Sequence, residues 1–221
     1  AGTITLNKLG GDYVYRTVSS DLGDGAASGL WMTDRGYKRV AFLVQNEEST
    51  ISPAQVARQK VEASNIELTD YVVYNPGQPS YQAELISVLS NEPDAIYLAG
   101  GQESGITVIK EAIAGGFTGE WLFTADLAVP EVFNSVGAGL LNGRAFVEYA
   151  VLRDVADGGE PVSTFAAGRD ALAAGKDINY EGASGDVAFD ASGTVAGSYS
   201  IQAAKDGAWV DTKFYPASAF E

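Results

Sequence analysis

The stretch Val40-Ala-Phe-Leu-Val44 decides the fold class of this chain. It is a short, continuous apolar run without polar alternation, which is typical of a strand buried on both faces of a parallel sheet. Gly36-Tyr-Lys-Arg39 leads into the run. Pro53 is expected to open a helix after it, because proline is tolerated in a first helical turn. The run therefore predicts the first unit of a strand–helix alternation.

The same alternation continues toward the C-terminus. Apolar isoleucines recur at spacings of three and four from Ile106 to Ile113, which predicts one of the intervening helices. Strands separated by helices of this length indicate a parallel sheet covered on both faces. Upstream, we expect a strand over residues 13–18 and a helix from near Asp24. Further strands are predicted at residues 70–74, 95–99, 120–124 and 144–149, and further helices at 81–90, 130–136 and 163–174.

Residues 182–210 have the pattern of a β-hairpin with two turns. Val187 and Phe189 alternate with polar neighbours, as Tyr199, Ile201 and Ala203 do later. The turns are expected at Asp190-Ala-Ser-Gly193 and Lys205-Asp-Gly207, where Asp and Gly supply turn chemistry. The predicted fold class is α/β: an open, mainly parallel sheet with helices on both faces and a C-terminal β-hairpin.

Charge and composition exclude several kinds of function. The 221-residue chain has 29 acidic and 14 basic residues and a formal net charge of −15, so we expect no nucleic-acid partner. A solvated acidic surface explains this charge, and a saline habitat would also select it. The chain has no cysteine and no histidine, which excludes disulfides, thiolate nucleophiles and histidine acid–base catalysis. We therefore predict no catalytic residue, no metal and no cofactor.

One glycine motif keeps an enzymatic alternative open. Gly23-Asp-Gly-Ala-Ala-Ser-Gly29 has a spacing that some dinucleotide-binding folds use to bring a helix N-terminus to a pyrophosphate. Asp21 and Asp24 would repel such a phosphate. The favoured interpretation is a small-residue helix face packed on the sheet, and the alternative is a nucleotide-cofactor-binding α/β enzyme that uses Gly23, Gly25 and Gly29.

The candidate ligand-binding residues follow the predicted strands. Open parallel sheets bind ligands at the carboxyl ends of their strands. The loops there offer hydroxyl and amide groups and a carboxylate, a set that suits a small polar ligand whose ammonium group is held by Asp126. The predicted ligand-binding residues are Asn46, Ser49, Thr50, Gly101, Gln102 and Asp126.

Several segments, in this order, resemble one protein family. They are the C-terminal hairpin pattern and, before it, Asp12-Tyr-Val-Tyr-Arg-Thr-Val-Ser-Ser-Asp21, Val40-Ala-Phe-Leu-Val-Gln-Asn46, Asp94-Ala-Ile-Tyr-Leu-Ala-Gly-Gly101 and Gly175-Lys-Asp-Ile-Asn-Tyr-Glu-Gly-Ala-Ser-Gly185. Together they are similar to the type 1 periplasmic binding proteins of the branched-chain amino-acid-binding kind. These are the substrate-binding components of ABC importers.

The resemblance implies a non-catalytic receptor with two α/β lobes, which three crossing segments hinge and which close on a ligand. Its partners would be a small polar ligand and a membrane permease, and its location periplasmic or extracellular. By position, Ser49 and Thr50 fall in a ligand loop. Gln102 stands where an aromatic residue often follows the paired glycines, and Asp126 matches the acid that receives an α-ammonium group.

The resemblance covers mainly the second lobe. We expect residues 1–20 to form a crossing segment and first strand, 21–150 the ligand-binding lobe, and 151–221 an irregular segment, a short helix and the hairpin. The first lobe is then missing, and residues 152–164 are shorter than in the family. A single lobe offers half a cleft, which predicts weak binding or none by this chain alone. A sensory or scaffold domain with the receptor fold is a further alternative.

Overall fold

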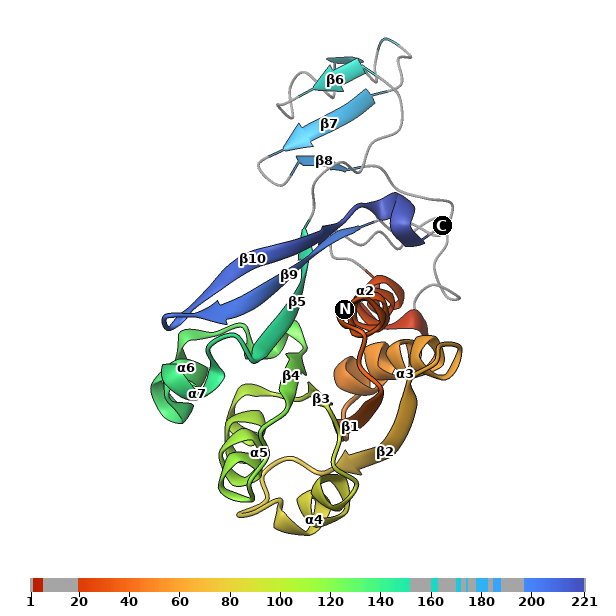
Figure 1. The fold of residues 1–221 in the computed structure, drawn as a ribbon. Coiled ribbons are helices and arrows are strands. Elements are labelled where there is room, and N and C mark those ends of the chain that lie inside the picture. Colours follow the sequence, from red (N-terminus) through yellow and green to blue (C-terminus); the bar gives the residue numbers. More distant parts are fainter. Residues whose placement is uncertain are drawn as a thin grey trace.

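The computed structural model describes residues 2–5, 20–151, 160–162, 170–171, 174, 178–182, 185–187 and 197–220. Its centre is a seven-stranded sheet with the strand order β10-β9-β5-β4-β3-β1-β2 (Figure 1). Strands β1 to β5 run parallel, β9 is antiparallel to β5, and β10 is antiparallel to β9. The α/β fold class predicted from the sequence is confirmed.

All five predicted parallel strands after residue 36 are present. The apolar run of β1 is buried along its whole length, as expected for a strand covered on both faces. The strands of the main sheet are β1 (Arg39–Gln45), β2 (Glu67–Tyr74), β3 (Ala95–Ala99), β4 (Glu120–Phe123), β5 (Ala145–Val151), β9 (Ser198–Lys205) and β10 (Ala208–Tyr215).

The helices divide the core into two layers. Helices α4, α5 and α6 enclose a cluster around Trp121 and Phe123 on one face of the sheet. Helices α2 and α3 enclose a second cluster around Phe42 and Tyr97 on the other face. The helices are α2 (Asp21–Arg35), α3 (Glu48–Glu62), α4 (Gln82–Ser90), α5 (Gln102–Ala114), α6 (Pro130–Val136) and α7 (Ala138–Leu141), with 3-10 turns η1 (Ala125–Leu127) and η2 (Ala217–Phe220).

Helix α3 begins earlier than the sequence suggested. Pro53 lies inside the helix and does not open it, so that expectation is wrong. The Thr50 hydroxyl donates to the backbone carbonyl of Gln45 at 2.6 Å, which fixes an additional turn before the proline. Proline then removes one backbone N–H from the helix without ending it.

The C-terminal hairpin is confirmed in its second half. Strands β9 and β10 are joined at Asp206 and Gly207, whose φ angles of 52° and 80° are those of a primed hairpin turn. Val187 is not part of this hairpin, because it lies in a separate three-stranded sheet. In that sheet, β7 (Ile178–Gly182) lies between β6 (Glu160–Val162) and β8 (Gly185–Val187) and pairs with both. Ten residues, 188–197, separate β8 from β9, too many for a tight hairpin.

Three sequence predictions fall outside the described residues. They are the strand over residues 13–18, Phe189 and the turn over residues 190–193. Of the helix expected over residues 163–174, the structure describes Asp170 and Ala171, which are helical, and Ala174.

Three segments of the chain that are far apart in the sequence come together at one edge of the sheet. Val151, at the end of β5, pairs with Ser198, at the start of β9. The Tyr199 hydroxyl donates to the carbonyl of Ser20 at 3.3 Å, so the start of α2 lies beside them. This is the carboxyl edge of the five parallel strands, where the predicted ligand residues also lie.

Candidate functional site

Gln45 joins two loops at the carboxyl edge. It is the last residue of β1, and its side chain is buried. Its Oε1 atom accepts a hydrogen bond from the backbone N–H of Gly101 at 3.0 Å and another from the hydroxyl of Ser104. The sequence analysis did not include Gln45 among the candidates. The available signal was a polar residue that ends an otherwise apolar strand.

The residues after β1 hold the first loop in shape. The Asn46 backbone N–H donates to the Tyr74 carbonyl at 2.7 Å, and its side-chain amide donates to Asn75 Oδ1 at 2.9 Å. Thr50 is buried and its hydroxyl bonds to the loop backbone, whereas Ser49 is exposed at the start of α3. Thr50 thus closes the loop, and direct contact of Thr50 or Ser49 with a ligand remains a prediction.

A cavity of about 390 Å³ lies between the loops that follow β1, β2 and β3. Gln45 and Glu47 line it from the first loop, and Gly101 and Gln102 from the third. Its volume is suited to a small molecule. The structure therefore brings two of the predicted residues, Gly101 and Gln102, to one cavity. The other four, Asn46, Ser49, Thr50 and Asp126, lie at the same edge of the sheet outside the lining of this cavity.

Asp126 extends the site toward β4. It lies in η1, which follows β4, and its side chain is only partly covered by the protein. Partial burial raises the pKa of the Asp126 carboxyl, and the negative charge of Glu47 raises it further. Asp126 and Glu47 thus place negative charge from two different loops at this edge. A ligand ammonium group between them would relieve the repulsion.

Helix starts add hydrogen-bond donors to the same edge. Ser20 caps α2, with its hydroxyl 3.4 Å from the Leu22 backbone nitrogen. Helices α3 and α5 start without a side-chain cap. Their first backbone N–H groups are suited to donate hydrogen bonds to a carboxylate or hydroxyl oxygen. The edge thus combines carboxylates with backbone donors, which is the complement of a small zwitterion.

The glycines of the nucleotide-like motif are packing positions. Gly23 and Gly25 lie within α2 and not in a loop before it. A Cβ atom on Gly23 would lie 2.1 Å from the Tyr199 hydroxyl, and one on Gly25 would lie 2.3 Å from the Pro53 carbonyl oxygen. One on Gly29 would lie 2.4 Å from Lys60 Cβ. The small face of α2 packs against α3 and β9, not around a phosphate.

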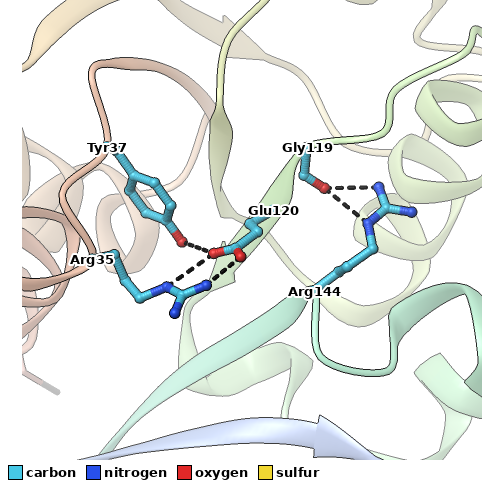
Figure 2. A network of polar contacts seen from close by, with 5 residues as sticks. All are labelled: Arg35, Tyr37, Gly119, Glu120 and Arg144. Atoms are coloured by element: carbon cyan, nitrogen blue, oxygen red, sulfur yellow. Dashed lines mark hydrogen bonds and ion pairs between the residues drawn. The ribbon is translucent and has the colours of Figure 1, made fainter.

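A larger hollow of about 740 Å³ lies at the opposite, amino edge of the sheet. Three of its polar side chains, those of Arg35, Tyr37 and Glu120, bond to one another (Figure 2). Arg35 forms an ion pair with Glu120, and the Tyr37 hydroxyl donates to the same carboxylate at 2.5 Å. Arg144 donates to the Gly119 carbonyl at 2.7 Å. These contacts tie the start of β4 to its neighbours, and we assign this hollow a structural role.

An open, mainly parallel sheet with polar loops gathered at its carboxyl edge is the arrangement in which α/β proteins bind ligands. The model of the periplasmic binding protein family matches residues 1–167, and the chain belongs to this family. The family is non-catalytic, as the sequence analysis expected. Within the described residues, no helix is long and apolar enough to cross a membrane, and no group of three or more acidic side chains is placed to hold a metal ion.

Several solved structures share the fold at low sequence identity. A leucine binding protein from Thermotoga maritima is 19% identical with a TM-score of 0.74, and the match covers 92% of this chain and 68% of that one. A branched-chain amino acid transporter substrate binding protein from Streptococcus pneumoniae, solved with isoleucine, is 14% identical with a TM-score of 0.67, covering 91% and 68%. A solute binding protein from R. palustris, solved with benzoate, is 16% identical with a TM-score of 0.70, covering 92% and 66%. A search of curated proteins found no significant match.

Proposed function

We propose that this chain is the ligand-binding lobe of an ABC importer's solute-binding protein and that its ligand is an amino acid or a similar small polar molecule with an ammonium group. The observation that supports this most is that two acidic residues of the carboxyl edge, Asp126 and Glu47, raise the cost of negative charge there. Asp126 and Glu47 come from the loops after β4 and β1 and interact electrostatically. Glu47 also lines the 390 Å³ cavity, so a cation held by the pair lies beside a space for the rest of the ligand.

The proposed roles follow from position. Asp126 and Glu47 bind the ammonium group, while Gln102 and the backbone of Gly101 orient the ligand in the cavity. Asn46 and Ser49 contribute from the rim of the first loop. Thr50 supports that loop through its bond to the Gln45 carbonyl.

Capture would involve a second lobe. The chain meets the ligand edge at Ser20, Val151 and Ser198, which is the arrangement that three hinge segments require. A second lobe attached there would close over the ligand, and the closed form would be presented to a membrane permease outside the cytoplasm. The chain alone supplies one wall of the cleft, so its own affinity should be in the millimolar range or weaker, roughly −4 kcal/mol or less in magnitude.

Titration of the chain with a panel of amino acids, followed by amide chemical shifts, tests this function. Shifts should concentrate at the loops after β1, β3 and β4. The substitution Asp126→Asn should weaken binding about tenfold or more, because a charge-assisted hydrogen bond contributes about 1.5–3 kcal/mol. Glu67→Gln, an exposed acid in a weak ion pair with Arg39 (3.7 Å), is the matched control and should change nothing.

Two results would refute the proposal. One is binding at the amino-edge hollow in place of the carboxyl edge. The other is equal binding by the Asp126→Asn variant and the unmodified chain. Benzoate, the ligand in one related structure, serves as an anionic comparison and should not bind, because the Asp126–Glu47 pair would repel its carboxylate.

A further inference from the structure

The first described residues of the chain lie on the carboxyl edge of the sheet and bridge two helices. The backbone carbonyl of Gly2 accepts a hydrogen bond from the N–H of Asp21 at 2.8 Å, at the start of α2. The hydroxyl of Thr3 donates to Glu48 Oε1 at 2.7 Å, at the start of α3. Two consecutive residues therefore connect the N-termini of α2 and α3.

The next residue adds a second bond to α3. The backbone N–H of Ile4 donates to the hydroxyl oxygen of Ser52 at 3.3 Å, and only 2% of the surface of Ser52 is exposed. Both bonds reach the first part of α3, so they fix this short segment along the helix start. We call residues 2–4 the clasp.

The clasp gives two neighbouring acids different partners. Glu47 lines the 390 Å³ cavity, whereas the carboxylate of Glu48 accepts the bond from Thr3. On the inner side of the same loop, the hydroxyl of Thr50 bonds to the carbonyl of Gln45 at 2.6 Å. The start of α3 is thus held from two sides, and Glu48 is directed to the clasp while Glu47 is left to the cavity.

The clasp also connects this loop to a point where the chain enters the lobe. Asp21, the partner of Gly2, directly follows Ser20. The carbonyl of Ser20 accepts the hydroxyl of Tyr199 at 3.3 Å, which places it beside the start of β9. A rearrangement at either end of the clasp would therefore strain hydrogen bonds at the other end.

We propose that Thr3 is a positioning residue of the ligand site: through Glu48 it holds the start of α3 in the form that binds ligand, and a bound ligand in turn stabilises the clasp. Such a coupling is reciprocal by thermodynamic necessity. The coupling rests on the proposed function, whereas the positioning of Glu48 does not. The inference deepens that function by making a segment outside the cavity a determinant of affinity.

The positioning role is tested without ligand. Thr3→Val keeps the shape of the side chain and removes the donor, and Thr3→Ser restores it. By NMR, the amides of Ile4 and Asp21 should exchange hydrogen about fivefold faster in Thr3→Val, the factor expected for one lost hydrogen bond. Thr3→Ser should match the unmodified chain, as should Thr118→Val, an exposed threonine at the amino edge. Equal rates in Thr3→Val and Thr118→Val would overturn the role.

A double-mutant cycle shows whether Thr3 acts through Glu48. Glu48→Leu removes the acceptor and should speed exchange of the Ile4 amide by the same factor as Thr3→Val. The double variant should exchange no faster than either single variant, because both substitutions remove one and the same bond. If the two effects multiply instead, the residues act independently and the proposal is overturned.

The coupling is tested with leucine as the probe. Saturating leucine should slow exchange of the Ile4 amide about fivefold in the unmodified chain and in Thr3→Ser, and should not slow it in Thr3→Val. By reciprocity, Thr3→Val should weaken leucine binding by the same factor. Equal leucine affinity of the unmodified chain and Thr3→Val overturns the coupling and leaves the proposed function standing. If leucine shifts no amide at the carboxyl edge of the unmodified chain, the proposed ligand class fails, and the ligand-free exchange rates still decide the positioning role.

Discussion

The side-chain carbonyl of Gln45 accepts a hydrogen bond from the backbone N–H of Gly101 at 3.0 Å, so the end of β1 is bonded directly to the start of α5. The two residues are 56 positions apart in the sequence. The loops that line the cavity are therefore fixed relative to each other before any ligand arrives, which reduces the entropy lost on binding.

Replacing Gln45 should affect stability, whereas replacing Gln102 should affect binding alone. Gln45→Leu leaves the buried Ser104 hydroxyl and the Gly101 N–H without their acceptor, at a cost of about 1–3 kcal/mol in the free energy of unfolding. Gln102 is exposed, and Gln102→Leu should change stability by less than about 0.5 kcal/mol. Urea unfolding of both variants measures the free energy of unfolding of each. An equal loss of free energy in the two variants would contradict the assigned roles.

Gly23 should not tolerate a side chain. Gly23→Ala places a Cβ atom 2.1 Å from the buried Tyr199 hydroxyl, and the overpacking should destabilise the chain by about 1–3 kcal/mol. Gly139→Ala is the matched control, because no atom lies within 4 Å of its added Cβ in α7. Thermal unfolding should show a lower Tm for Gly23→Ala alone. A nucleotide-binding role for this glycine would instead predict normal stability.

Stability should fall as the pH rises through the titration of Glu148. Because burial raises its pKa, the folded chain keeps this proton at pH values where the unfolded chain has lost it. Its contribution is complete below the unfolded carboxyl pKa of about 4.3 and declines as the pH approaches the higher folded value. Between about pH 5 and about pH 8, Glu148→Gln should gain Tm relative to the unmodified chain. A constant difference across that range would show that Glu148 does not titrate there.

The Glu120 carboxylate should matter more than an exposed ion pair. Glu120→Ala removes the partner of both Arg35 and Tyr37 at the start of β4, and should cost about 1–2 kcal/mol. Glu62→Ala breaks the exposed pair with Arg58 within α3 and should cost less than about 0.5 kcal/mol. Chemical denaturation at low and high salt compares the two. If both variants lose the same free energy of unfolding, the contacts of Glu120 with Arg35 and Tyr37 stabilise the chain no more than an exposed ion pair does.

The sequence predicts the parallel sheet well because each strand is a local apolar run with its own boundaries. Val40-Ala-Phe-Leu-Val44 has no polar alternation, which favours a strand buried on both faces of a sheet. Asp126 and Gln102 could be placed at one edge because each follows a parallel strand, and the carboxyl ends of parallel strands lie at the same edge of the sheet. Gln45 and Glu148 could not be found in this way. The role of Gln45 depends on a contact with Gly101, far away in the sequence, and the burial of Glu148 is determined only by the assembled sheet.

The three points at which the chain meets the ligand edge have a mechanical consequence. Ser20, Val151 and Ser198 lie together, and the packed sheet extends from them toward its amino edge. Strand β1 alone has seven residues, or about 23 Å. In the closure proposed above, the lobe would rotate about these three points. Even a rotation of a few degrees would move the amino edge the farthest, so reporter groups placed near Asp94 or Gly116 should give the largest signal of closure.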